Sequence, residues 1–174
     1  LDIAEAVEGA KPFCDEVLVM DGHSTDRTRE IAATSGARVE LDPGKGKGSA
    51  IRAALGLAKG DIVVFMDADG SHDPKDIPKL VKPVADGQVD LCVGSRFLGG
   101  SEELSIDFGQ LIRSIGNISM NIAINKRFNV QLSDTLNGYR AIRRETGLAL
   151  KLIENKHTIE QEMVIRALRT GHKV

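Results

Sequence analysis

One stretch of this chain reads Asp61-Ile62-Val63-Val64-Phe65-Met66-Asp67-Ala68-Asp69-Gly70-Ser71-His72-Asp73-Pro74. Its apolar run, from Ile62 to Met66, is β-branched or aromatic at four of five positions and is too short for a helix. A short continuous run of this kind predicts a strand that is covered on both faces, as in the middle of a parallel sheet. The stretch therefore points to an α/β fold.

Two carboxylates one residue apart, Asp67 and Asp69, follow this strand. Open α/β sheets bind their ligands at this C-terminal edge. Carboxylates this close repel each other unless a cation lies nearby, and their hard oxygen atoms suit Mg²⁺ or Mn²⁺, which takes further partners from substrate phosphates and water. The pair predicts a divalent-metal site for a phosphorylated substrate. The alternative is a pair of solvated turn residues, one of which caps the next helix.

The chain up to Gly94 alternates short apolar runs with amphipathic segments. We expect strands at 16–20, 37–41, 61–66 and 90–94, and helices at 1–7, 24–36, 49–59 and 74–85. This alternation predicts βαβ units and a mainly parallel sheet flanked by helices, in one domain. Further on, we expect a loop at 97–107, a strand-like end to 133–142, and helices at 111–125, 145–152 and 159–170.

The composition narrows the class of protein. The 174 residues are 41% apolar and 28% charged with a net charge of −2, which fits one ordinary soluble domain and gives no sign of a nucleic-acid partner. Cys14 and Cys92 lie far apart and show no metal-binding spacing. No apolar run approaches the roughly 20 residues that span a bilayer. Because Leu1 and Val174 both fall inside apparent elements, we expect a piece of a longer protein, truncated at both ends.

Two further groups are expected near the same edge of the sheet. Asp21 ends the 16–20 strand and could accept hydrogen bonds from a base or ribose, or could simply hold a turn. Lys47 lies in the loop Gly44-Lys45-Gly46-Lys47-Gly48-Ser49, which leads into a helix and suits an anionic phosphate. The loop lacks the Walker A spacing, so a merely flexible loop is the alternative.

Two arginines and one more aspartate are candidates for an acceptor site. Arg96 follows the 90–94 strand and Arg113 opens a helix, so both could hold a second phosphate, although solvated arginines are common at such positions. Asp134, in the polar run 133–140, is a candidate general base or else a turn cap. The four histidines show no paired spacing and are interpreted as structural or solvated.

Several motifs resemble those of family 2 glycosyltransferases. The segments at 17–28, 46–50 and 66–69 are similar to that family's "VDDGSxDGT", "GKGxA" and metal-binding DxD motifs. Within the family, Val93-Gly94-Ser95-Arg96-Phe97, the run 133–140 and Glu160-Gln161-Glu162-Met163 resemble the dolichyl-phosphate mannose synthase group. The resemblance covers essentially the whole chain, and the motifs follow the same order.

The resemblance implies a GT-A nucleotide-sugar-binding fold whose N-terminal strand is missing from this chain. It implies a nucleotide-sugar half at 1–95 and an acceptor half at 96–174. Residues implied to bind the nucleotide sugar are Asp21, Ser24, Lys47, Gly48 and Asp67. The metal would be held by Asp69 with Asp67, and the phosphate of a polyprenyl phosphate by Arg96 and Arg113, with Asp134 near the acceptor oxygen. Ser71 stands where the relatives often carry a metal-binding Gln, so a third protein ligand is not evident.

The function expected from this resemblance is that of a metal-dependent, inverting glycosyltransferase. It would move a hexose from GDP-mannose or UDP-glucose to a polyprenyl (dolichyl-type) phosphate at the cytoplasmic face of a membrane, with a homo-oligomer as one possible state. Transfer to a glycan or protein hydroxyl is the alternative within the enzyme class. A non-catalytic nucleotide-sugar-binding module is the alternative from a different class, and a nucleotidyltransferase is a third possibility.

Overall fold

The computed structural model describes residues 3–95 and 108–174, and the side chains of 108–115 and 117 are not described. Its N-terminal elements are α1 (Ile3–Ala10), η1 (Lys11–Phe13), β1 (Leu18–Asp21), α2 (Thr28–Thr34), β2 (Arg38–Leu41), α3 (Lys47–Leu57) and β3 (Ile62–Phe65). These are followed by η2 (Pro74–Asp76), α4 (Ile77–Ala85), β4 (Leu91–Val93), α5 (Phe108–Phe128), β5 (Arg140–Arg143), α6 (Arg144–Ala149) and α7 (Ile159–Arg169). The predicted loop at 97–107 lies outside the described residues.

Each strand pairs in one of two sheets. β1 and β2 are parallel, with Leu18 opposite Arg38, whereas the second sheet has the order β3-β5-β4. β5 is antiparallel to both neighbours, so β3 and β4 run in the same direction and end at the same edge. The expected direction of β3 and β4 is therefore present, but their direct parallel ladder is not, because β5 lies between them. Nothing in the four residues of β5 signals this insertion.

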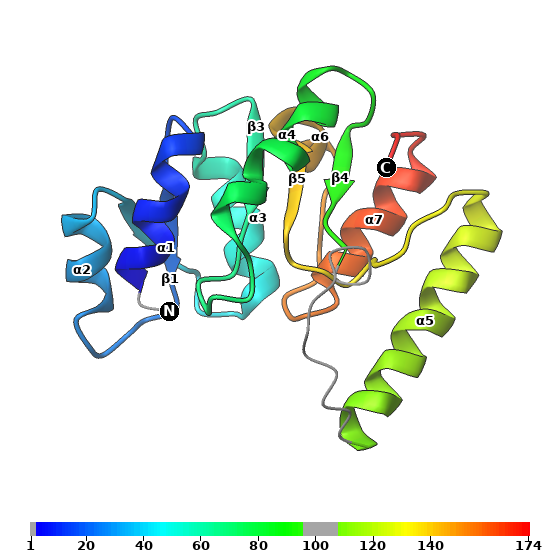
Figure 1. Ribbon diagram of the computed structural model, residues 1–174, viewed down its shortest axis with the longest axis horizontal. Coiled ribbons are helices and arrows are strands. Elements are labelled where there is room, and N and C mark those ends of the chain that lie inside the picture. The colour runs from blue at the N-terminus through cyan, green and yellow to red at the C-terminus, as the bar shows by residue number, and fades with distance from the viewer. Residues whose placement is uncertain (1–2, 96–107) are drawn as a thin grey trace.

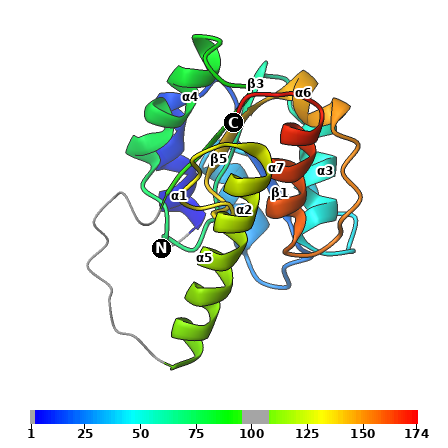
Figure 2. The same cartoon turned by 90° about the vertical axis from the view of Figure 1, so that its right-hand side faces the viewer.

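Helices cover both faces of the sheets. Figures 1 and 2 show α1 and α4 on one side and α3, α6 and α7 on the other. β3 contributes to both layers, since Val63 and Phe65 pack against the core around Met163, while Ile62 and Val64 pack against the core that contains Val84. This confirms the prediction that the strand is covered on both faces.

A cavity of about 960 Å³ separates the two sheets. The edges of β1 and β3 border it, Ala6, Val7 and Ala10 of α1 line one side, and α3 lines the other, including Ala54. Within the described residues, β1 pairs only with β2 and β3 only with β5. The sheet is therefore interrupted between β1 and β3, which explains why the side chains of β3 keep partial exposure.

Local chemistry sets the helix boundaries. Gly46 adopts a φ of 105° immediately before α3, so this helix begins at Lys47 rather than at the predicted Ser49. α2 begins at Thr28 rather than at the predicted position 24, and its N-cap residue is Arg27, which makes no side-chain cap hydrogen bond. Asp26, one residue earlier, accepts hydrogen bonds from the backbone N–H and hydroxyl of Thr28. Pro74 begins η2 and not the helix itself, which follows at Ile77.

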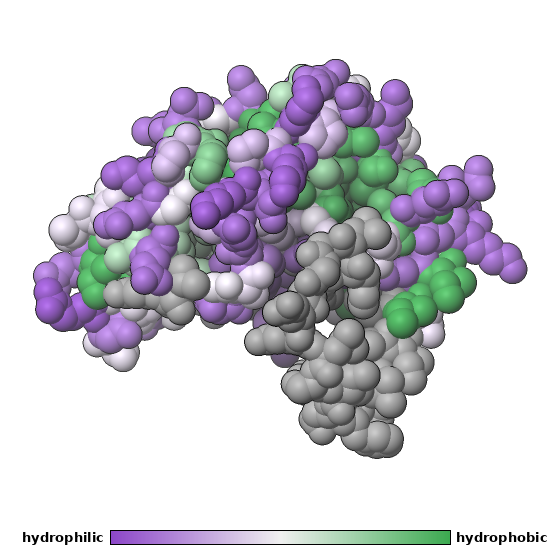
Figure 3. Space-filling model, viewed as in Figure 1, coloured by the Kyte–Doolittle hydropathy of each residue, from purple (hydrophilic) through white to green (hydrophobic). Residues whose placement is uncertain are grey.

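α5 extends away from the body of the molecule (Figures 1 and 2). Hydrophobic residues are visible over the described part of this helix in Figure 3, and Ile118 and Ile122 are 47% and 61% exposed. Among the described residues, no helix is both long enough and apolar enough to cross a membrane.

Candidate active site

Two residues that the sequence predicted for the site, Lys47 and Asp67, lie together at the end of β3, beside the first turn of α3. Nζ of Lys47 lies 2.9 Å from Oδ1 of Asp67 and 3.1 Å from Oδ2 of the same carboxylate. The same ammonium lies 2.9 Å from Oε1 of Glu160, at the start of α7. Three elements that are distant in sequence thus converge on one cation. The Gly/Lys loop and the Asp-x-Asp segment are thus in contact through Lys47 and Asp67, and their part in substrate binding stays a prediction.

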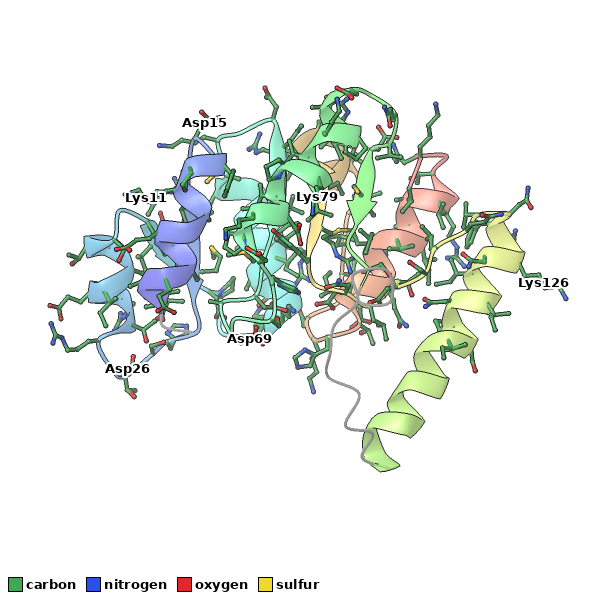
Figure 4. All side chains as sticks on the ribbon, viewed as in Figure 1. Lys11, Asp15, Asp26, Asp69, Lys79 and Lys126 are labelled. Carbon is green, nitrogen blue, oxygen red and sulfur yellow. The ribbon has the colours of Figure 1, made fainter. Side chains whose placement is uncertain are left out.

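Asp69 occupies the loop that follows β3, at the lower rim of the molecule in Figure 4. Its Oδ1 accepts hydrogen bonds from the backbone N–H (3.0 Å) and the hydroxyl (2.6 Å) of Ser71. These bonds lower the pKa of Asp69, because they favour its charged form. Gly70, with a φ of 84°, allows the tight turn between the two residues. An ionised, exposed carboxylate therefore lies two residues beyond Asp67, which contacts Lys47.

His72 joins this loop to the polar run 133–140. The backbone N–H of Asp67 donates to its Nδ1 (3.2 Å), and its Nε2 lies 3.2 Å from Oδ1 of Asn137. Because Nδ1 accepts a hydrogen bond, the proton of the neutral ring is on Nε2, which donates to Asn137. The ring also stacks on Tyr139, with centroids 4.7 Å apart. The interpretation of His72 as a structural residue is thus consistent with its contacts.

Gly138 brings the backbone of the polar run against the charged pair. A Cβ atom at this position would lie 2.7 Å from Oδ2 of Asp67 and 3.2 Å from Nζ of Lys47. Only a residue without a side chain leaves both groups where they are. The run 133–140 therefore forms one wall of the site.

Arg140 holds this wall in place through hydrogen bonds from its buried guanidinium group. Its side chain is 1% exposed, and its guanidinium donates to the backbone carbonyls of Asn137 and Glu160, the latter at 2.8 Å. Burial lowers the pKa of Arg140 to about 10, while the negative charges of Glu160, Asp134 and Asp67 oppose that shift. The group stays charged at neutral pH, and it ties the polar run to the start of α7.

Asp134 is buried in this run, and its Oδ1 accepts a hydrogen bond from the backbone N–H of Leu136 (3.2 Å). The adjoining segment is held by α5: Asn121 accepts hydrogen bonds from the backbone N–H and hydroxyl of Thr135 and donates to the carbonyl of Ser133. The turn contact expected of Asp134 is present. Its role toward an acceptor stays a prediction.

Gly48 serves a close backbone contact. Its N–H donates to the carbonyl of Asn155 (2.9 Å), and a Cβ atom would collide with the carbonyl oxygen of Glu154. In this structure the amide is therefore used inside the protein, and the part of Gly48 in substrate binding stays a prediction.

Asp21 and Ser24 lie at the end of β1. Oδ2 of Asp21 accepts a hydrogen bond from the backbone N–H of Ser24 (3.0 Å) and lies 3.6 Å from Nε of Arg29. Hydrogen bonding by Ser24 lowers the pKa of the Asp21 carboxyl, and the charge of Arg29 adds to that shift. The turn contact is present, and binding of a base stays a prediction. Arg96 lies outside the described residues, and Arg113 lies in α5, where its side chain is not described.

The donor set fits a hard divalent cation in part. Asp69 offers an ionised carboxylate, and Asp67 a second one that Lys47 neutralises. Within the ranges that the structure describes, no group of three His, Cys, Asp or Glu residues could hold a metal ion together. Two protein carboxylates with substrate phosphates and water are a common environment for Mg²⁺. The arrangement fits a metal that arrives with a diphosphate better than a permanent structural metal.

The model of one protein family, glycosyl transferase family 2, matches residues 3–146. The chain belongs to this family. The match includes β1 to β5, Lys47, Asp67 and Asp69, but ends before α7 and Glu160.

Relatives of this family 2 chain include proteins from archaea and bacteria. It is 34% identical over 158 residues to glycosyltransferase AglJ of Haloferax volcanii, covering 90% of this chain and 50% of that protein. It is 33% identical over 175 residues to the undecaprenyl-phosphate mannosyltransferase of Micrococcus luteus, covering 91% and 68%. The chain thus spans from half to about two thirds of the length of these two relatives.

A solved structure supports the same fold. The glucosyl-3-phosphoglycerate synthase of Mycobacterium tuberculosis, in complex with Mn²⁺, uridine diphosphate and phosphoglyceric acid, superposes with a TM-score of 0.74. It is 26% identical and covers 98% of this chain and 60% of that one. The predicted GT-A fold and the predicted membership of glycosyltransferase family 2 are confirmed.

Sequence reasoning missed two residues of this site in the family 2 chain: Glu160 and Asn137. Glu160 was noted within a family motif but was not assigned to the site, because a glutamate in the first turn of a helix is ordinary on dipole grounds. Asn137 gave no signal of its own beyond its position in a dense polar run.

Proposed function

We propose that this chain is the catalytic domain of a metal-dependent, inverting glycosyltransferase that moves a hexose from GDP-mannose or UDP-glucose to a polyprenyl phosphate. The observation that carries the proposal is the 2.9 Å contact between Lys47 and Asp67 at the end of β3, with Asp69 two residues further on. A cation and two carboxylates at one sheet edge suit a diphosphate with its metal ion. Family membership supports a hexosyltransferase.

The donor would bind along this edge. Asp69, with Asp67, would hold Mg²⁺ or Mn²⁺, and the ion when bound would neutralise the charge that develops on the leaving diphosphate. Lys47 would donate to a phosphate oxygen. Asp21 and Ser24, at the end of β1, would contact the base or ribose, and Gly48 would adjoin the diphosphate. The solved relative with Mn²⁺ and uridine diphosphate supports this donor class.

The acceptor would approach from the 96–174 half. Arg96 and Arg113 would hold its phosphate, and an oxygen of that phosphate would attack the anomeric carbon while the bond to the diphosphate breaks, which inverts the configuration. Such an oxygen is already ionised at neutral pH, so Asp134 would position the acceptor more than remove a proton. The undecaprenyl-phosphate mannosyltransferase relative supports this acceptor class. A lipid acceptor would place the enzyme at a membrane, and we propose the cytoplasmic face. A homo-oligomer is also compatible with the proposal.

A second candidate is transfer to a small phosphorylated acid. The solved relative that holds phosphoglyceric acid favours this acceptor. The two arginines would serve either acceptor, because both present a phosphate group.

Transfer assays distinguish these acceptors. The protein is incubated with labelled GDP-mannose or UDP-glucose, with Mn²⁺ or with EDTA, and with polyprenyl phosphate in vesicles, 3-phosphoglycerate or an oligosaccharide. We expect Mn²⁺-dependent transfer to the lipid phosphate and a strong loss with Arg96→Ala. Transfer to the oligosaccharide that survives Arg96→Ala would contradict a phosphate acceptor, and transfer to 3-phosphoglycerate alone would support the second candidate. Donor binding without transfer to any acceptor would favour a non-catalytic module.

A further inference from the structure

Glu160 is a buried carboxylate at the edge of the proposed donor site. It lies in the first turn of α7 and is only 4% exposed. Its Oε1 is 2.9 Å from Nζ of Lys47, while its Oε2 is buried without a hydrogen-bond partner among the described residues. Burying a carboxylate is unfavourable unless its charge is compensated. Lys47 is the cation that this side chain contacts.

Helix chemistry alone does not account for this burial. An acidic residue in a first turn stabilises a helix through the dipole even when it is exposed. Glu162, one residue beyond Gln161, instead accepts hydrogen bonds from the backbone N–H groups of Ile153 and Glu154. Glu162 therefore holds the loop before α7. The carboxylate of Glu160 makes no hydrogen bond to this loop among the described residues and contacts Lys47 instead.

We propose that Glu160 is the positioning residue that holds the ammonium of Lys47 at the sheet edge, ready to bind a nucleoside diphosphate. Lys47 is shared between two carboxylates at equal distances, Oδ1 of Asp67 and Oε1 of Glu160. If Asp67 turned toward a bound cation, Glu160 would still hold the lysine. This inference rests on the proposed function, since it assigns the diphosphate as the ligand of Lys47.

Two further observations agree with this role. Gly138 closes the space around the ammonium, since a Cβ atom there would lie 3.2 Å from Nζ of Lys47. Burial lowers the pKa of Lys47, but its hydrogen bonds with Asp67 and Glu160 outweigh that effect and raise the pKa above its ordinary value of 10.5. Lys47 therefore stays charged in a half-buried place, as a phosphate ligand must.

A double-mutant cycle tests the proposal. Dissociation constants for UDP and GDP with Mn²⁺ are measured by calorimetry for the unchanged protein, Glu160→Gln, Lys47→Met and the double variant. A hydrogen bond to a charged group is worth roughly tenfold or more in an equilibrium constant, so each single change should weaken binding about tenfold. The double variant should bind no more weakly than Lys47→Met. Additive losses would overturn the proposal, because Glu160 would then act without Lys47.

A second measurement does not depend on nucleotide binding. The free energy of unfolding is measured by urea denaturation for the unliganded protein, its two single variants and the double variant. The effects of Glu160→Gln and Lys47→Met should not add, whereas those of Lys47→Met and Glu145→Gln, which alters an exposed first-turn glutamate of α6, should add. Additive effects of Glu160→Gln and Lys47→Met would overturn the pairing itself. Loss of nucleotide binding in every variant and in the unchanged protein, with the expected non-additive effects on unfolding, would instead contradict the proposed function.

Discussion

His72 holds together the two segments that form the proposed site. Its Nδ1 accepts from the backbone of Asp67, and its Nε2 donates to Asn137. Phenylalanine in its place keeps a ring beside Tyr139, but the backbone N–H of Asp67 and the side-chain oxygen of Asn137 each lose the hydrogen bond that they make with His72. We expect His72→Phe to lower the free energy of unfolding by about 1–3 kcal/mol. Urea denaturation measures this, and the exposed His157→Phe serves as the control; equal effects of the two changes would contradict the account.

Asp21 should make the free energy of unfolding depend on pH in the acid range. Its folded pKa lies below the ordinary value of 3.8, chiefly because of hydrogen bonding by Ser24. The unfolded chain therefore binds the proton more readily, so the stability that Asp21 contributes is complete above pH of about 4 and is lost as the pH falls through the folded pKa.

The variant Asp21→Asn should consequently lose less stability than the unchanged protein between pH 7 and pH of about 3. Urea denaturation at the two pH values measures the difference. Asp15→Asn, which changes an exposed side chain, should retain the full decline. A decline in Asp21→Asn as large as in the unchanged protein would show that this carboxylate is not the source.

At the scale of single residues, site candidates could be recognised from the sequence where they directly follow a predicted strand or begin a predicted helix. Asp67 and Asp69 end an apolar run, and Lys47 opens a helix after glycines, so topology alone brought them together. Glu160 lies more than 90 residues away in sequence from both aspartates. Its burial depends on how α7 packs, which no local pattern records.

α3 contains two glycines with opposite roles. Gly48, near its start, faces the carbonyls of 154–155, with the carbonyl carbon of Asn155 2.9 Å from a would-be Cβ atom. Gly56, near its end, has no atom within 4 Å of such a position.

We expect Gly48→Ala to lower the free energy of unfolding by about 1–3 kcal/mol through overpacking. Gly56→Ala should raise it by about 0.5–1 kcal/mol, because alanine restricts the unfolded chain and favours the helix. Denaturation curves of the two variants test this pair. A stabilising Gly48→Ala would contradict the close packing of α3 against the 154–155 segment.

The elements were predicted more fully than their pairing. Periodicity located the helices and strands through β4, since each apolar run is bounded by Gly, Pro or Asp. The position of β5 between β3 and β4 was not foreseen, because Ala141 and Ile142 carry no mark of strand direction. Both are fully buried, so the middle of this sheet is occupied by a late segment of the chain.

At the scale of the whole molecule, a cavity of about 960 Å³ lies between β1 and β3. Ala54 of α3 lines it, whereas Ala167 of α7 is fully buried in the core around Met163. Ala54→Leu should raise the free energy of unfolding by about 1 kcal/mol by covering apolar surface. Ala167→Leu should lower it by about 1–3 kcal/mol. Equal losses in both variants, measured by urea denaturation, would mean that the cavity is not open space.

We infer that the edge beyond β3 binds a nucleoside diphosphate together with a divalent cation. Asp69 and Asp26 offer a matched pair, because each accepts one backbone and one hydroxyl hydrogen bond from the residue two positions on, and each lies apart from the other in Figure 4. Asp69 lies two residues beyond Asp67, which contacts Lys47, whereas Asp26 lies in the segment that leads into α2.

Calorimetric titration of UDP and GDP with and without Mn²⁺ therefore tests the account most directly. We predict that the protein binds one of the two nucleotides at least about tenfold more tightly with Mn²⁺ than without it. A factor of about ten is what one additional charge-assisted contact contributes to an equilibrium constant. Asp69→Asn should abolish that gain, and Asp26→Asn should keep it. A gain that persists in Asp69→Asn would contradict the account.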